Sequence, residues 1–284
     1  MSDQTVRTIF DEYYFATGCG RPYGRDPEWM SFFDQIAARI QSTIQPASVL
    51  DAGCAWGLLV EALRRREVDA FGVDVSEFAV RKAHPDVRRF CWVGSLAEPL
   101  PGAYDLVVCI EVLEHMPPEQ AERALGHLCH LSRDILFSST PFDYKEATHF
   151  NVRPPEYWAE AFARQGYFRD VDYDASYITP WAVRYRKGDQ PLARIVRDYE
   201  RRYFELWKEN VDLRQLAAEN RDTLSDYYQR LAQAEQGSAL AHQELESILS
   251  SRSWKLGRSL ADLRLRLAPN GSRRARLLKK IGLF

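Results

Sequence analysis

The residues VLDAGCAWG, Val49 to Gly57, decide the fold, because they combine an apolar strand, an acid, a turn of small residues and a helix start. Gly53 lets the backbone approach a ligand closely, and the helix after Gly57 presents free N–H groups. The dinucleotide pattern G-x-G-x-x-G would need glycines at positions 55 and 58, where the chain has alanine and leucine. Asp51 would repel a pyrophosphate and attract an ammonium group. The turn therefore predicts a ligand site that is not an NAD site.

On both sides of this turn, short apolar runs alternate with amphipathic runs. The predicted strands are residues 48–52, 70–74, 89–93, 105–110 and 134–139, with two more candidates inside 168–187. The predicted helices between them are residues 58–65, 77–84, 118–131 and 154–166. This alternation predicts an α/β fold with a parallel, doubly wound sheet. With the two further candidates, which no helix separates, we expect a Rossmann-like sheet of seven strands in residues 46–190. Residues 1–45 are rich in aromatic side chains, and we expect them to form a helical cap on the sheet.

A heptad pattern begins after Pro191 and predicts a C-terminal α-helical coiled coil over residues 191–250. Of the sixteen a and d positions between residues 196 and 248, thirteen are apolar or aromatic. As one helix this segment would be roughly 80 Å long. Asn210 at an a position favours a parallel dimer, so we expect a homo-oligomer. The alternative is a helical hairpin that turns at Gly237 and folds back onto the body.

The charge of the chain is divided between an acidic body and a basic tail. Residues 251–284 hold ten Lys or Arg and one acid, a net charge of +9, whereas residues 1–250 carry −11. This basic, amphipathic tail predicts binding to an anionic membrane surface. Docking to an acidic partner, such as a glycosyltransferase, and a solvated tail are the alternatives.

Targeting signals and cysteine usage bear on the compartment. No apolar run reaches the 18 residues of a membrane span, and no secretory signal is visible at the N-terminus. The five cysteines form no CxxC pair, which favours a reducing compartment. We therefore expect a cytoplasmic protein, either free or peripheral at the inner membrane.

Asp74 ends the second predicted strand, 23 residues after Asp51. A carboxylate at this position can accept both hydroxyl groups of a ribose. One acid for an ammonium group and one acid for a ribose, without a phosphate cradle, describe S-adenosylmethionine (SAM) better than a nucleotide phosphate. The spacing therefore predicts SAM as the cofactor.

Residues 48–140 resemble a class I SAM-dependent methyltransferase of the E-V-L-E-H subgroup. VLDAGCAWG resembles the glycine-rich motif, with Ala55 in place of the usual middle glycine, and FGVDVS (71–76) resembles the ribose motif. YDLVVCIEVLEHM (104–116) and LFSSTP (136–141) resemble the fourth- and fifth-strand motifs. Ser95, or a backbone N–H, replaces the acid that the family often has after the third strand. The cofactor-binding residues that the resemblance implies are Asp51, Gly53, Cys54, Gly57, Asp74, Val75, Ser95 and Glu111.

Catalysis should involve side chains after the fourth and fifth strands. Methyl transfer to a hydroxyl needs alignment and a base or a metal. His149, in the loop after the fifth strand, is the predicted base, with Glu111 and His115 as further catalytic candidates; alternatively His149 only orders its loop. Glu111, Glu114, His115 and His149 also resemble the Mg²⁺ or Mn²⁺ ligands of a small-RNA 2′-O-methyltransferase family. Many metal-free relatives share E-V-L-E-H, so a divalent metal is not the favoured prediction.

The N-terminal residues 12–29 contain Tyr13, Tyr14, Tyr23, Arg21 and Arg25 among small residues. Aromatic side chains with arginine suit a sugar face and an anionic group. The alternative is that these side chains only pack within the cap.

THFNVRPPEYW (148–158), the long C-terminal helix and SRSWKLGRSL (251–260) together resemble methyltransferases encoded with glycan-assembly enzymes. This resemblance predicts an O-methyltransferase acting on a sugar or surface polysaccharide, such as O-antigen or capsule, or on its lipid-linked precursor. The alternatives are a SAM-binding coiled-coil scaffold of a glycan-assembly complex, or an O-methyltransferase acting on RNA or a small molecule. The charge of −11 on residues 1–250 argues against a nucleic-acid partner.

Overall fold

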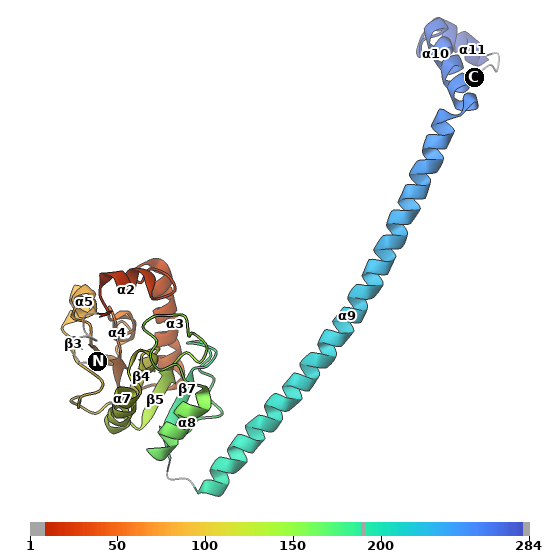
Figure 1. Ribbon diagram of the computed structural model, residues 1–284. Coiled ribbons are helices and arrows are strands. Elements are labelled where there is room, and N and C mark those ends of the chain that lie inside the picture. The colour runs from red at the N-terminus through yellow and green to blue at the C-terminus, as the bar shows by residue number, and fades with distance from the viewer. Residues whose placement is uncertain (1–8, 189–190, 281–284) are drawn as a thin grey trace. The chain divides into compact units, whose positions relative to one another are not determined.

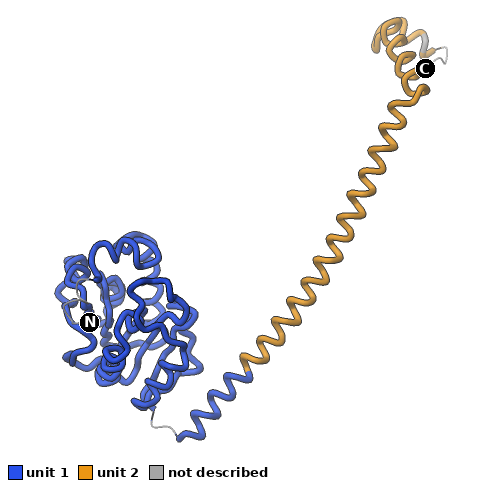
Figure 2. Tube along the Cα trace, in the orientation of Figure 1, with its two compact units in different colours: residues 1–204 blue, residues 205–284 orange. Residues whose placement is uncertain are grey.

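The computed structural model describes residues 9–188 and 191–280 (Figure 1). The chain divides into two compact units, one ending at Phe204 and one beginning at Glu205 (Figure 2). The first unit holds the sheet and the cap, and the long helix that begins at Leu192 continues through the boundary.

One sheet of seven strands forms the centre of the first unit. Its strands are β1 (Ser48–Ala52), β2 (Asp69–Asp74), β3 (Cys91–Val93), β4 (Leu106–Ile110), β5 (Asp134–Ser138), β6 (Tyr167–Arg169) and β7 (Val183–Lys187). Their order is β3-β2-β1-β4-β5-β7-β6. Strands β1 to β5 pair in parallel, whereas β7 is antiparallel to both β5 and β6. The predicted doubly wound, seven-stranded sheet is confirmed, and the two strand candidates that no helix separates, β6 and β7, form its antiparallel end.

The helices lie close to the ranges expected from the sequence. Those of the first unit are α2 (Glu12–Thr17), α3 (Pro27–Thr43), α4 (Leu58–Arg64), α5 (Glu77–Lys82), α6 (Pro85–Arg88), the 3₁₀ helix η1 (Leu113–His115), α7 (Pro118–Leu131) and α8 (Pro155–Arg164). The C-terminal helices are α9 (Leu192–Ser250), α10 (Arg252–Leu267) and α11 (Arg273–Lys280). Two aspartates, Asp11 and Asp26, cap the N-termini of α2 and α3, because their carboxylates accept backbone N–H groups of the first helical turn.

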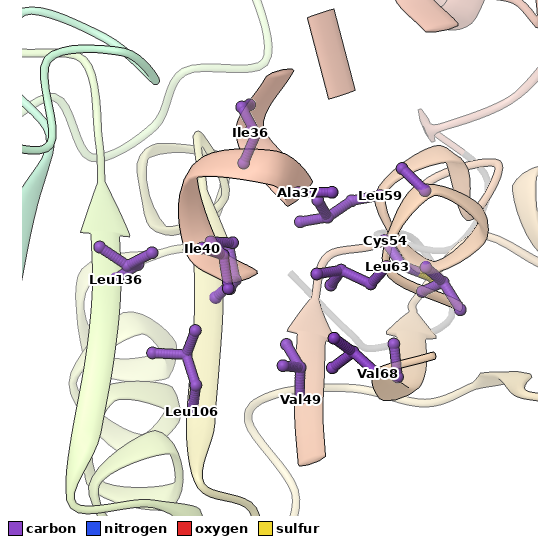
Figure 3. Close-up of a cluster of buried hydrophobic side chains, with 14 of the residues drawn as sticks. Ile36, Ala37, Ile40, Val49, Cys54, Leu59, Leu63, Val68, Leu106 and Leu136 are labelled. Carbon is purple, nitrogen blue, oxygen red and sulfur yellow. The ribbon is translucent and has the colours of Figure 1, made fainter. Parts of the chain in front are cut away.

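Alternate residues of the central strands point to opposite faces of the sheet, as strand geometry requires. Val49, Leu106 and Leu136 belong to a core formed with α3 and α4 (Figure 3). The neighbouring residues Leu50 and Val107 belong to a second core, formed with α7 and α8. Both faces of the sheet are therefore covered, which explains why its strands are almost continuously apolar.

Helix α9 is a single helix of 59 residues, so the alternative of a hairpin that turns at Gly237 is wrong. None of its residues is buried, and its a and d side chains are open to solvent; Leu224, for example, is 54% exposed. Pairing of α9 into a coiled-coil homo-oligomer stays a prediction. Within the described ranges 9–188 and 191–280, no helix has the length and apolar character that crossing a membrane requires.

Candidate active site

The candidate site lies where the carboxyl ends of β1 and β4 meet. In the sheet, β1, β2 and β3 follow one another outward to one edge, and the strands from β4 onward lie towards the other edge. The strand order therefore reverses between β1 and β4. Ligands of open α/β sheets bind at such a point. Gly53 has a φ of +94°, and a Cβ there would lie 2.3 Å from Cγ2 of Val112. Only glycine therefore allows the β1 turn to pack against the β4 loop.

A cavity of about 320 Å³ opens at this point. Of the site residues predicted from the sequence, those that line it are Asp51, Gly53, Cys54, Asp74, Val75, Ser95, Glu111 and His115. The described residues Gly57, Glu114 and His149 do not line it. Gly57 has a packing role instead, because a Cβ there would lie 2.9 Å from Sγ of Cys91.

The two acids that anchor the cofactor prediction lie in this cavity. Asp74 accepts the backbone N–H groups of Ala55 and Ser76, each at 2.8 Å, and so ties the β1 turn to the end of β2. Burial, with the nearby charge of Asp74, raises the pKa of Asp51 to about 8. The carboxyl of Asp51 is thus held protonated at neutral pH until a cation approaches it.

A hydrogen-bonded chain leads from the cavity wall into the protein through His115. Nδ1 of His115 lies 2.9 Å from Oγ1 and 3.3 Å from the carbonyl oxygen of Thr148. A carbonyl only accepts, so Nδ1 carries the proton of the neutral ring. Nε2 then accepts from the hydroxyl of Tyr14, 3.3 Å away, and the hydroxyl of Thr148 donates to Glu146.

Burial sets the protonation of His115 and of Tyr14, the two rings of this hydrogen-bonded chain. It lowers the pKa of His115 to about 3, so the imidazole is neutral at physiological pH. It also raises the pKa of Tyr14 well above its usual value, which keeps the phenol protonated. Tyr14 therefore presents its hydroxyl oxygen to the cavity, while the proton of this hydroxyl is donated to Nε2 of His115.

His149, the predicted base, lies behind this pair. Its ring centroid is 4.6 Å from that of His115, and its Nδ1 donates to the carbonyl oxygen of Asp143 at 2.8 Å. It does not line the cavity. The geometry places His115 and Tyr14, and not His149, at the wall where an acceptor would bind.

Three of the four candidate metal ligands come together. One ligand atom from each of Glu114, His115 and His149 lies within 4.8 Å of the others. Glu114 is fully buried, its Oε2 has no hydrogen-bond partner, and burial and the charge of Glu111 raise its pKa well above the usual value. Glu111 is not among these three residues, and its carboxylate accepts from the indole of Trp181 at 2.9 Å. A metal at this cluster would have to displace Tyr14 or Thr148 from His115.

Aromatic side chains of the N-terminal cap form one wall of the cavity, and of these only Tyr14 and Tyr23 were predicted from the sequence. The cap side chains that line the cavity are Phe10, Tyr14, Phe15, Tyr23, Trp29, Phe32 and Phe33. Tyr13 is 76% exposed and lies outside the cavity. Arg21 pairs with Asp26 and Glu28, and Arg25 pairs with Glu61, so both arginines are occupied by protein carboxylates. The clustering of aromatic residues in the first 33 positions was the available signal for this wall.

Thr179 also lines the cavity, and no sequence signal pointed to it. Its Oγ1 is buried without a hydrogen-bond partner. A buried hydroxyl of this kind is costly unless a ligand or water satisfies it.

Comparison with known proteins places this site in context. A family model described as "Methyltransferase domain" matches residues 23–171. The ubiquinone biosynthesis O-methyltransferase of Chromobacterium violaceum is 32% identical over 123 residues, which cover 40% of this chain and 51% of the relative. The enzyme of the same name from Dechloromonas aromatica is 42% identical over 101 residues, covering 32% and 43%. The chain thus spans about half the length of the curated relatives that it matches.

Among solved structures, the magnesium protoporphyrin IX methyltransferase of Synechocystis PCC 6803 with bound SAH matches with a TM-score of 0.50. The match is 20% identical and covers 64% of this chain and 99% of that chain, and it shows the shared fold. The sequence-based prediction of a polysaccharide O-methyltransferase is contradicted, because the curated relatives are named for the biosynthesis of a small molecule, ubiquinone.

Proposed function

The chain belongs to the methyltransferase family whose model matches residues 23–171, and we propose that it methylates a hydroxyl group of a small, uncharged molecule. The predicted enzyme class, a SAM-dependent methyltransferase, and the predicted cofactor, SAM, are confirmed. The acceptor is the part that we propose.

The charge of the cavity carries this proposal. Asp51, Asp74 and Glu111 line it, and among the described lining residues there is no lysine or arginine. Three carboxyl groups suit the ammonium and sulfonium charges of SAM and repel a phosphate or carboxylate on the acceptor. Aromatic side chains of the cap line the same cavity and offer an apolar surface to the acceptor. The same carboxyl groups argue against RNA, whose backbone is anionic.

The names of the curated relatives support a hydroxyl acceptor. They are O-methyltransferases of ubiquinone biosynthesis, with regions 32% and 42% identical to this chain. We carry over only the class of acceptor, an oxygen nucleophile on a small molecule. The scaffold alternative loses support, because a SAM-binding relic would not need the hydrogen-bonded chain at His115.

The geometry around His115 supplies a route for the acceptor's proton. When bound, SAM would supply the methyl group and its sulfur would leave as a neutral thioether, so that the acceptor hydroxyl would become a protonated ether. This proton passes to the oxygen of Tyr14 while Tyr14 passes its own proton to Nε2 of His115. Nδ1 remains protonated and bonded to Thr148.

The low pKa of His115 is compatible with this step. A neutral imidazole whose pKa is about 3 is a weak base. A protonated ether is a far stronger acid than an imidazolium, so transfer to His115 is still downhill. His115 therefore acts late, once the methyl group has bonded to oxygen, and Tyr14 orients the hydroxyl before that.

Incubation with methyl-labelled SAM tests the acceptor class. The acceptors should be neutral phenols and alcohols, each matched with an analogue that carries a phosphate or a carboxylate. We expect the neutral member of each pair to be methylated about 100-fold faster or more, because an anion would face the carboxyl groups. Equal rates for both members, or a preference for the anionic one, would refute the proposal.

The affinity for SAM should depend on pH through Asp51. Its pKa of about 8 means that it is protonated in the ligand-free protein below pH 8. An ammonium group favours the carboxylate, so binding should release a proton, and affinity should rise by up to about tenfold per pH unit between pH 6 and 7.5. Calorimetry in buffers of different ionisation heat measures this release. Asp51→Asn is the matched control and should bind weakly, with no release; if its release equals that of the unmodified protein, Asp51 is not the group responsible.

A further inference from the structure

We propose that α10 and α11 form a docking surface for an anionic lipid membrane. Neither helix takes part in the proposed methyl transfer, so the inference stands independently of the acceptor. Both are well-formed helices: the hydroxyl of Ser251 caps α10 by accepting the N–H of Trp254 at 3.2 Å, and that of Ser272 accepts the N–H of Ala275 at 3.1 Å. Between them, Gly271 makes the turn with a φ of +84°.

A row of four leucines runs along one side of α10. Leu256, Leu260, Leu263 and Leu267 are spaced by four, three and four residues, so they span only about 60° of the helix circumference. Their side chains are between 52% and 63% exposed. Trp254 does not belong to this row, because at 3.6 residues per turn it lies about 160° from Leu256, on the opposite side of α10. The exposed row is therefore made of leucine alone.

Cations flank this row and continue into α11. Arg252 and Arg266 lie on one flank of the leucines and Arg264 on the other. Within residues 251–280 there are ten lysines or arginines and a single acid, Asp262. Helix α11 contains five lysines or arginines together with Leu277, which is 66% exposed. The sequence pattern also places Leu278, Ile281 and Phe284 on an apolar face with Leu277, but the side chain of Leu278 and residues 281–284 lie outside what the structure describes.

The combination of exposed leucines and cations indicates which kind of partner binds to α10 and α11. A second copy of this segment would bring the same cations against each other, and a nucleic acid would leave the leucine row in water. An anionic bilayer surface satisfies both, because leucines enter the boundary between headgroups and acyl chains while cations contact the headgroups.

Co-sedimentation of the full chain with vesicles tests this surface. We expect it to sediment with vesicles of three parts phosphatidylcholine to one part phosphatidylglycerol at 0.05 M NaCl. Binding should fall at least about tenfold at 0.5 M NaCl, because salt screens the cations. Binding to pure phosphatidylcholine should also be at least about tenfold weaker.

A pair of neighbouring substitutions separates membrane insertion from charge alone. Leu260→Asp places a charge in the leucine row, whereas Ala261→Asp places the same charge on the far side of α10. We expect at least about tenfold weaker vesicle binding for Leu260→Asp and a much smaller change for Ala261→Asp, with helical content and SAM affinity unchanged in both. Equal losses, or no sedimentation of the unmodified chain at low salt, would overturn the proposal and favour an acidic protein as the occupant.

Discussion

Replacing Asp74 with alanine should weaken SAM binding by about 10²–10⁴-fold. We expect its carboxylate to accept both ribose hydroxyls, and each hydrogen bond to a charged group is worth about 1.5–3 kcal/mol. The two backbone N–H groups that it already accepts, from Ala55 and Ser76, leave lone pairs free for these bonds. Calorimetric titration with SAM measures the effect.

Asp69→Ala is the matched control, because Asp69 begins the same strand and its exposed carboxylate pairs with Arg64. It should leave SAM affinity within about twofold. Loss of the N–H contacts of Asp74 could loosen the turn, so Asp74→Asn, which keeps one acceptor oxygen, should bind with intermediate affinity. An unchanged dissociation constant in folded Asp74→Ala would remove Asp74 from the cofactor site.

Replacing Tyr14 with phenylalanine should lower turnover by about 10²-fold or more while SAM affinity stays within about twofold. The substitution removes only the hydroxyl that donates to Nε2 of His115. The ring and its edge-to-face contact with Phe10, whose centroid is 4.9 Å away, are kept. A comparison of kcat with the SAM dissociation constant separates this role from simple ordering of the cavity.

Tyr13→Phe provides the control, since this neighbouring tyrosine is 76% exposed and lies outside the cavity. It should retain full activity. The metal alternative makes the opposite prediction, because with a metal on Glu114, His115 and His149 the chemistry would not depend on the hydroxyl of Tyr14. Chelation that abolishes activity, rescue by Mn²⁺, and full activity of Tyr14→Phe would together refute the proton route through Tyr14.

Much of the fold was predictable from the sequence, because it depends on local patterns. The five parallel strands fall within one or two residues of their expected ranges, since buried strands between helices must be apolar. Asp51 and Asp74 were predictable for the same reason: each lies at the carboxyl end of a strand, and parallel strands deliver these ends to one edge. Helix α9 followed from its heptad pattern.

The surroundings of several predicted site residues depend on tertiary packing, which the sequence does not show. His149 was the predicted base because it follows the fifth strand, yet its ring packs behind His115. Arg21 and Arg25 suggested an anion site, but nearby carboxylates neutralise both. The predicted polysaccharide acceptor is contradicted by the curated relatives, because a resemblance carried mainly by segments outside the cavity gives no information about the chemistry of the cavity.

The sequence by itself determined the elements, their order and the cofactor-binding turn, because hydrophobic period, glycine positions and strand-end acids act over a few residues. Only the tertiary structure brought Tyr14 to His115, 101 positions away, and made the aromatic cap a wall of the cavity. It also decided protonation: burial raises the pKa of Asp51 to about 8 and lowers that of His115 to about 3. Such shifts arise from excluding water around a charge, and that depends on how distant segments pack.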